Sequence, residues 1–447
     1  MVSSGFLAVI SGLCLVLVAP KSLAAEASYF RDIAPIIQRQ CQGCHQPNLK
    51  SSNLDLTSYE SFKTGGKRGP AAGILIGYLT GESKPQMPLG QPPLPAEQID
   101  LFRAWIAAGA KDDTPPEARD DIAPDKPIVY TLPPVINAVA FSPDGKTLAV
   151  SGNREVLLHS LEGAATPRRL PGLSDRILSL AFSKDGSTLV AAGGTPARFG
   201  EIQIWDVAAG KLRRSITMTG DTVFGVSISP DASKIAVGCT DNTVRIVDTV
   251  TGKELFKIGN HENWVLGTVF GVDGKRLVSV GRDQAAKLTD ASNGQFIENI
   301  NAFRGELAAV ARHPARDVIL IGGAERVPYL YTMDRAASMK IADDSTLIRK
   351  FEMQDGAIFA LAFSPDGSRI AVAGAADDVP IYQTETGERT ATCKGRKGTY
   401  AVAFSPDGEQ LATGGFDGKV RICEVKSGKL VRDFVPVPVE TQMASAR

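Results

Sequence analysis

One short turn sequence recurs along most of the chain and constrains the fold more than any other feature. "AFSPDG" ends at Gly145, and the same or a related sequence returns up to Gly408. The seven copies end at Gly145, Gly186, Ala232, Gly274, Ala315, Gly367 and Gly408. Neighbouring copies lie 41 to 52 residues apart. A period of this length is typical of a chain that stacks one supersecondary unit many times.

Each repeat contains four segments of strand length. In the first repeat, "VINAVAF" precedes the turn and "KTLAVSG" follows it. The turn combines Pro and Asp, which favour a tight turn, with Gly at the position that requires a positive φ. A third segment, such as "IQIWDV", and a fourth, such as "KLRRSIT", complete the unit. Four strands per unit of this length predict an all-β propeller of seven blades over residues 127–435.

The third segments end in a Trp-Asp pair that is complete only in "IQIWDV". With this pair, the region 127–435 resembles the WD-repeat propeller family. The resemblance implies that His261, Ser279 and Asp283 form a structural hydrogen-bond set in the fourth blade. This favours a structural role over a ligand role for His261.

Three details of the propeller need the structure. Residues 127–132 and 429–435 could both supply the outer strand of the last blade, so the closure of the ring stays open. Residues 333–350 form an irregular insert that lengthens one repeat, and we expect a partner-specific contact there. The acidic pairs at 343–344 and 377–378 are expected in solvated loops.

Residues 1–25 have the features of an export signal. Residues 6–18 are apolar, and small residues near Ala24 and Ala25 suit cleavage. We therefore expect an exported, periplasmic protein with no integral membrane span after signal removal; an uncleaved membrane anchor is the alternative. Basic and acidic residues balance at 49 each, so the charge does not favour a nucleic-acid partner.

Five cysteines follow the predicted signal. Cys239, Cys393 and Cys423 each lie in an apolar, strand-like run. An odd number spread in this way does not form a disulfide framework. We therefore expect these three side chains to be buried free thiols.

Residues 26–112 have a different pattern from the repeats. "YFRDIAPIIQRQ" and "PAEQIDLFRAWIAAGA" place apolar residues at helical spacing. This region is predicted to be a small all-α domain. The polar, proline-rich residues 113–126 are predicted to be a linker, and residues 436–447 a flexible tail.

The motif "CQGCHQP" occupies residues 41–47 of the helical region. A chance Cys-x-x-Cys-His is improbable with six cysteines and four histidines in 447 residues. A zinc site needs four ligands, and a thioredoxin-like dithiol belongs in an α/β pattern. The remaining interpretation is one covalently bound haem c, with thioethers at Cys41 and Cys44 and His45 as the proximal iron ligand.

The other side of the iron needs a second ligand or stays open. Met87 is the only methionine of this domain and lies in the proline-rich "KPQMPLGQPP". We predict Met87 as the distal ligand; the alternatives are a core methionine at this position and Lys84 as the ligand. Ligation by His and Met raises the reduction potential and closes the iron to substrates, which suits electron transfer.

The domain resembles the planctomycete-type cytochrome c family. The similar sequence covers "YFRDIAPIIQRQCQGCHQPNLKSSNLDLTSYESFKTGG" and "PQMPLGQPPLPAEQIDLFRAWIAAGA", nearly all of residues 28–110. The resemblance implies Cys41 and Cys44 as haem anchors, His45 as proximal ligand and Met87 as distal ligand. It also implies an electron-transfer module at the front of a larger exported protein.

These features predict an exported monohaem cytochrome that transfers electrons, with the propeller as a docking module for a redox partner or another protein. Such a protein is an electron carrier rather than a catalyst. One alternative is a haem oxidoreductase that uses the propeller as a second site, for which His159, His261 and His313 are the candidate ligands. The other is a propeller scaffold whose haem acts as a sensor.

Overall fold

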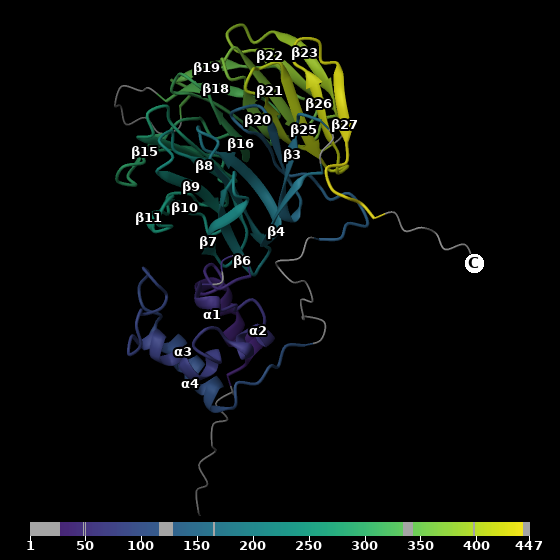
Figure 1. Cartoon of the computed structure of the whole chain (residues 1–447). Helices are drawn as coiled ribbons and strands as arrows, with labels where there is room; N and C mark the ends of the chain where they lie inside the picture. The colour runs from purple at the N-terminus through teal and green to yellow at the C-terminus, as the bar shows by residue number, and fades with distance from the viewer. Residues whose placement is uncertain are drawn as a thin grey trace, which may run out of the picture.

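The computed structural model describes residues 27–47, 49, 51–115, 128–163, 166–333, 343–396 and 398–440. In Figure 1, a group of short helices precedes a much larger body of β-strands. The predicted signal, most of the linker and the end of the tail lie outside the described residues, so those predictions stay untested. Among the described residues, no helix combines the length and the apolar character that crossing a membrane requires.

The first part of the described chain is helical. Its elements are a π-helical turn (Tyr29–Ile33), α1 (Ala34–Gln40), a 3-10 turn (Ser51–Asn53), α2 (Tyr59–Thr64), α3 (Ala71–Thr80) and α4 (Ala96–Ala107). Pro35 lies in the first turn of α1, where its missing N–H costs nothing. The core of this region gathers Ile33, Ile37, Phe62 and Trp105, all nearly inaccessible to solvent. We call residues 27–115 the helical region.

The remaining strands form one seven-stranded sheet and five four-stranded sheets in the described residues. The seven-stranded sheet contains β1 (Val139–Phe141), β2 (Thr147–Ser151), β3 (Asn153–Ser160), β4 (Arg168–Phe182), β5 (Thr188–Thr195), β6 (Phe199–Asp206) and β7 (Lys211–Thr219). The next two sheets contain β8 (Val223–Ile228), β9 (Lys234–Cys239), β10 (Val244–Asp248) and β11 (Glu254–Ile258), then β12 (Val265–Phe270), β13 (Arg276–Gly281), β14 (Ala286–Asp290) and β15 (Phe296–Asn299). The last three contain β16 (Leu307–Arg312), β17 (Val318–Gly323), β18 (Tyr329–Thr332) and β19 (Leu347–Lys350), then β20 (Ile358–Phe363), β21 (Arg369–Gly374), β22 (Asp378–Gln383) and β23 (Arg389–Lys394), then β24 (Thr399–Phe404), β25 (Gln410–Gly415), β26 (Val420–Glu424) and β27 (Leu430–Phe434).

The long strand β4 joins two units of four strands. Its residues 168–171 pair with β3, and its residues 176–182 pair with β5. The strand is therefore the outer strand of one unit and the inner strand of the next. Counted in this way, seven four-stranded units, or blades, follow one another along the chain (Figure 1). This mostly-β arrangement is consistent with a propeller.

The structure also answers how the ring closes. β27 pairs with β26 and is the outer strand of the seventh blade, while β1 of the first blade lies beside β24. Residues 128–132 add no strand to either blade. Tyr130 instead makes a single parallel bridge with Val439, and the Glu440 N–H donates to the Tyr130 carbonyl at 2.9 Å. Of the two candidate segments, 429–435 therefore takes the outer position.

The recurring turn has the same hydrogen bonds in several blades. The Ser142 hydroxyl donates to Asp144 at 2.5 Å and accepts from the Thr147 N–H at 3.0 Å, and Gly145 has a φ of 72°. The same donation from Ser to Asp occurs at Ser183, Ser229, Ser364 and Ser405. The predicted turn chemistry is confirmed in these repeats.

Arginines on three outer strands hold the turn of the following blade. Arg214 Nε donates to the Val250 carbonyl at 2.6 Å, and Arg349 Nη1 donates to the Thr386 carbonyl at 2.9 Å. Arg168 makes the equivalent contact with a turn of the second blade. These bonds link neighbouring blades outside their shared apolar core.

Two of the three propeller cysteines are not free. Cys393 of β23 and Cys423 of β26 form a disulfide between the sixth and seventh blades, with 6.1 Å between their Cα atoms. The prediction of free thiols was wrong for this pair, because it counted cysteines along the chain whereas neighbouring blades bring them together in space. Cys239 is a buried free thiol, as predicted.

The expected insert is shorter than 333–350. Its last residues form β19, the regular outer strand of the fifth blade. Residues 334–342 lie outside the described residues. The expected partner contact at this insert therefore stays a prediction for the residues before β19.

Candidate functional site

A cavity in the helical region brings together the four residues predicted to hold a haem. Cys41, Cys44, His45 and Met87 all line it. Its empty volume is about 1180 Å³, part of which is open to solvent. The rest of the lining is largely apolar and includes Leu54, Leu56, Ala71, Ile74, Leu75, Leu79, Pro85, Pro88 and Leu89. Such a lining suits a large, flat, apolar ligand fixed by a few polar groups.

The loop of residues 41–45 begins where α1 ends. The N–H groups of Cys44 and His45 both donate to the Cys41 carbonyl, at 3.2 and 3.0 Å. Both cysteines are free thiols. Burial, and to a lesser degree the neighbouring Cys44, raises the pKa of Cys41 to about 12. A redox dithiol needs a lowered thiolate pKa, so this environment does not favour that interpretation.

The hydrogen bond of His45 defines which ring nitrogen carries the proton. Nδ1 lies 3.1 Å from the Ser51 carbonyl, which can only accept, so Nδ1 donates. Burial lowers the pKa of His45, although the carbonyls of Ser51 and Leu54 act in the opposite direction. The ring is therefore neutral and keeps a lone pair on Nε2. A neutral imidazole held by a backbone carbonyl through its other nitrogen is the usual form of a metal-binding histidine.

Met87 reaches the cavity from the loop between α3 and α4. Its N–H donates to the Tyr78 carbonyl at 2.9 Å, which fixes the loop to α3. The half-buried side chain also packs against the helical core, so the structure fits both the ligand and the core-methionine interpretation. Lys84 is exposed and does not line the cavity, which favours Met87 over Lys84.

The mouth of the cavity carries positive charge that the sequence did not reveal. Lys67 and Arg68 line it, and both are exposed. Arg68 Nη1 donates to the Tyr78 hydroxyl, and its guanidinium lies 5.3 Å from the centre of that ring. The sequence "KTGGKRGP" does not predict the contact between Arg68 and Tyr78, because this contact depends on how α3 packs against the preceding loop.

Comparison with known families assigns the repeats. Residues 127–160, 210–248, 345–379 and 387–424 match the family model "WD domain, G-beta repeat". The chain carries WD40 repeats. The matched residues all lie beyond the helical region, so they support the propeller and do not bear on the haem prediction.

Among curated proteins, the similarity is limited to part of each relative. Transcription factor unc-37 of Caenorhabditis elegans is 32% identical over 202 residues, which are 44% of this chain and 31% of that protein. Protein tipD of Dictyostelium discoideum is 24% identical over 46% of this chain and 32% of its own length. Human WD repeat and SOCS box-containing protein 1 is 35% identical over 20% and 22%, respectively. The chain thus spans about a third or less of these relatives, and the similarity supports the WD40 repeats.

The predicted hydrogen-bond set of the fourth blade is confirmed. His261 Nδ1 lies 2.9 Å from the Asp283 carboxylate, and Nε2 lies 2.7 Å from the Ser279 hydroxyl. Both ring nitrogens therefore have partners within the blade. His313 also has a local role, since its Nδ1 accepts from the N–H groups of Ala315 and Arg316.

The second repeat contains a buried hydrogen-bond cluster around one carboxylate, which the sequence did not indicate. Glu201 is 1% exposed and accepts from Ser174 at 2.7 Å, from Gln203 at 2.6 Å and from Ser215. Gln203 in turn accepts from the Trp205 indole N–H at 3.1 Å. The cluster ties together β4, β6 and β7, and no sequence spacing indicates that these strands share it.

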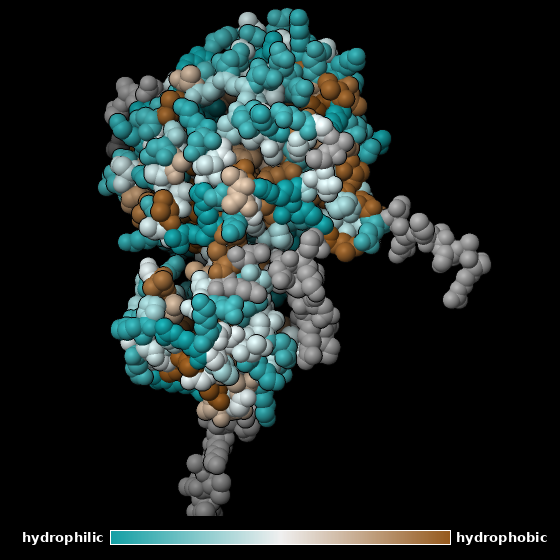
Figure 2. Space-filling model, in the orientation of Figure 1, coloured by the Kyte–Doolittle hydropathy of each residue, from teal (hydrophilic) through white to brown (hydrophobic). Residues whose placement is uncertain are grey.

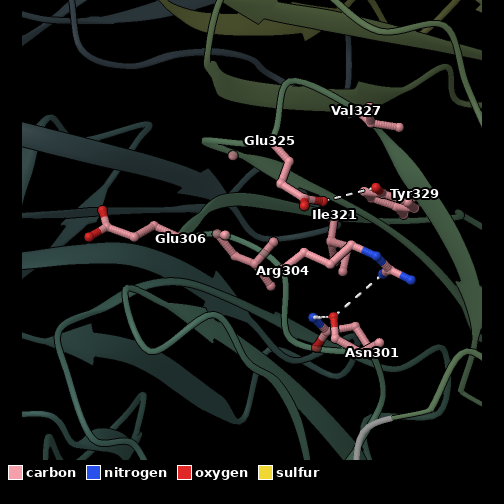
Figure 3. Close-up of a pocket in the computed structure, with 11 residues that line it drawn as sticks. Asn301, Arg304, Glu306, Ile321, Glu325, Val327 and Tyr329 are labelled. Atoms are coloured by element: carbon pink, nitrogen blue, oxygen red, sulfur yellow. Dashed lines mark hydrogen bonds between the residues drawn. The ribbon is translucent and has the colours of Figure 1, made fainter.

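A small cavity with both polar and apolar lining residues lies in the fifth repeat, with an empty volume of about 260 Å³. Figure 3 shows Tyr329 donating to Glu325 on one side. On the other side, Arg304 Nη1 and the Asn301 amide both donate to the Ala302 carbonyl, at 3.4 and 3.0 Å. Arg304 also donates to the Tyr331 hydroxyl at 3.2 Å and pairs with Asp344. The expectation that Asp344 lies in a solvated loop was wrong, because its carboxylate is half-buried between these two side chains.

Proposed function

We propose that this chain is an exported c-type cytochrome that binds one haem and transfers electrons, with its WD40 repeats as a docking module for a partner protein. One observation carries the proposal. Cys41, Cys44, His45 and Met87 come from two segments about 40 residues apart and line one apolar cavity. A structural role for each residue separately would not require this convergence.

Each side chain is in a form that suits its role. Cys41 and Cys44 are unpaired thiols, the form that adds to the vinyl groups of haem. His45 would offer Nε2 to the iron while the Ser51 carbonyl holds its Nδ1 proton. Met87 would offer its sulfur from a loop that is already fixed to α3. Haem c supplies, when bound, an iron that accepts and releases one electron.

The remaining residues would control access and charge. Apolar side chains of α3 line one side of the cavity, and an apolar surround of this kind would limit access of water to a bound iron. Lys67 and Arg68 at the mouth offer positive charge to acidic groups of a bound cofactor. The disulfide between Cys393 and Cys423 independently supports export, because disulfides persist in oxidising compartments.

Haem attachment is tested on the full chain exported in a bacterium that contains the cytochrome c maturation system. The expected result is one haem per chain that survives acid denaturation, seen as a mass increase and as cytochrome absorption bands. The double variant Cys41→Ser and Cys44→Ser should lose the haem, whereas Cys239→Ala in the propeller should keep it. Wild-type protein without haem would overturn the proposal and leave a WD40 scaffold.

The identity of the distal ligand distinguishes electron transfer from the two alternatives, a haem sensor and an oxidoreductase. Oxidised wild type should show the weak near-infrared band of a sulfur–iron bond, and Met87→Leu, which keeps the packing volume, should lose it. Lys84→Ala should keep the band. If reduced wild type instead binds carbon monoxide readily, the iron is open, and a haem sensor or an oxidoreductase becomes the better interpretation.

A further inference from the structure

The loop that carries Met87 has little burial to hold it in place. None of residues 84–91 is buried, and the visible face of the helical region is mainly hydrophilic to neutral, with small hydrophobic patches (Figure 2). Two backbone bonds tie the loop to the end of α3. The Ser83 N–H donates to the Gly77 carbonyl at 2.8 Å, and the Met87 N–H donates to the Tyr78 carbonyl at 2.9 Å. We therefore expect the position of Met87 to depend strongly on hydrogen bonds at the end of α3.

The turn of residues 66–69 places Arg68 against the same end of α3. The first and last residues of the turn, both glycines, donate to each other's carbonyls at 3.2 and 3.0 Å. Arg68 Nη1 donates to the Tyr78 hydroxyl, and its guanidinium lies 5.3 Å from the centre of that ring. The same nitrogen lies 3.5 Å from the Lys84 carbonyl oxygen, where the loop begins. Arg68 thus contacts both the residue that binds the Met87 backbone and the start of the loop.

The turn is also bonded to the segment that holds His45. The Lys67 N–H donates to the Ser52 carbonyl at 3.0 Å. A Cβ atom added at Gly66 would lie 2.9 Å from the same carbonyl oxygen, so the two segments are in close contact. The neighbouring carbonyl, that of Ser51, binds Nδ1 of His45. One short segment of backbone therefore connects the predicted proximal ligand with the turn that carries Arg68.

We propose that Arg68 is a positioning residue for Met87, and that the turn of residues 66–69 ties the Met87 loop to the segment that holds His45. Both predicted iron ligands are then held by one hydrogen-bonded frame before a cofactor binds. A site that is ordered in advance loses less conformational entropy when a weak bond, such as that of a thioether to iron, forms. The role toward iron rests on the proposed function, whereas the hold on the loop does not.

The hold on the loop is tested without haem, in the full chain whose two haem-anchor cysteines are replaced by serine. Arg68→Gln should speed hydrogen exchange of the Met87 amide about tenfold, the factor expected when a bond from a charged donor is lost. Exchange in α1 should not change, which shows that the helical region still folds. Arg103→Gln is the matched control, because Arg103 is an exposed arginine of α4 that pairs with Asp100. Equal exchange at Met87 in Arg68→Gln and in the parent chain would overturn the proposal.

A second variant tests whether Arg68 acts through the side chain that it binds. Tyr78→Phe removes the hydroxyl that accepts from Arg68 and keeps the carbonyl that accepts from Met87. It should also speed exchange at Met87, and adding Arg68→Gln should then have little further effect, because both changes remove the same bond. If the two effects multiply instead, Arg68 acts independently of Tyr78 and the proposed connection is wrong.

The role toward iron is tested in the haem-loaded chain. Arg68→Gln should weaken the near-infrared band of the sulfur–iron bond and let the reduced iron bind carbon monoxide faster, while Arg103→Gln should match wild type in both. An undiminished band in Arg68→Gln would overturn this role. Wild type that carries haem without the band would overturn it together with ligation by Met87, and wild type without haem would overturn it together with the proposed function. In both of these cases, exchange at Met87 would still decide the hold on the loop.

Discussion

His261 of the propeller and His45 of the helical region differ in what their ring nitrogens contact. His261 is buried, and its two nitrogens face Asp283 and Ser279. His45 is half-buried, and its Nδ1 faces a backbone carbonyl while the ring lines a cavity. The first arrangement uses the histidine completely within the fold. In the second, only Nδ1 has a hydrogen bond of this kind, and the proposed function assigns the other nitrogen to the iron. We therefore expect hydrogen-bond geometry to separate two roles that residue type does not.

The cysteines of the two regions also differ, because one pair is bonded within the fold and the other is free. Cys393 and Cys423 lie on neighbouring blades and form a disulfide. Cys41 and Cys44 are separated by only two residues and stay unpaired beside the cavity. In an oxidising compartment, two thiols this close would form a disulfide unless another reaction consumed them first, and covalent attachment of haem would be such a reaction.

Reduction should therefore weaken only the propeller. Opening the disulfide, which spans 30 residues, should lower the free energy of unfolding by about 3.5 kcal/mol through the larger entropy of the unfolded chain. Urea unfolding followed by the β-sheet circular dichroism band, with and without a phosphine reductant, measures this difference. Haem attached as we propose should stay bound, because thioethers are not reduced under these conditions.

The double variant Cys393→Ala and Cys423→Ala is the control, since it should no longer respond to the reductant. An equal response in the variant would show that the sensitivity arises elsewhere in the chain.

The histidines give a second test of the comparison. His261→Ala should lower the free energy of unfolding by about 3 kcal/mol, because it leaves the buried Asp283 carboxylate without its main donor. The haem spectrum should not change. His45→Ala should have the opposite profile, with an altered spectrum and an unchanged unfolding curve of the sheets. Loss of sheet stability in His45→Ala would remove the distinction between the two roles.

The propeller could be predicted from the sequence because its determinants are local and repeated. Each blade carries its own turn residues, and a periodic pattern needs no knowledge of distant contacts. The hydrogen-bond set of His261 was accessible for the same reason, since all three residues lie within one repeat. The motif of residues 41–47 is equally local, which is why a haem site could be proposed from it.

Features that depend on two separate segments were missed or mistaken. The disulfide joins two blades, Glu201 joins three strands, and Arg68 meets Tyr78 only after α3 has packed. In each case the partners are unrelated in sequence, and only the folded chain determines that they meet.

The smallest difference that we expect between the two regions is in how their stability depends on acidic pH. The Ser hydroxyls of the recurring turns lower the pKa of the turn aspartates, in the case of Asp366 to about 2. A carboxyl group whose pKa is lower in the folded than in the unfolded chain stabilises the fold above its unfolded value of about 3.9. This contribution is lost as the pH falls from about 4 toward 2.

We therefore expect the stability of the sheets to fall over that pH range by a small amount per turn, since these side chains are exposed and well solvated. Asp366→Asn should reduce the loss of unfolding free energy that urea unfolding measures between pH 5 and pH 2. Asp100→Asn on the exposed face of α4 should leave this loss unchanged. If the two variants have the same acid profile, the turn aspartates contribute nothing beyond an ordinary surface charge, and the propeller owes its turns to Pro and Gly alone.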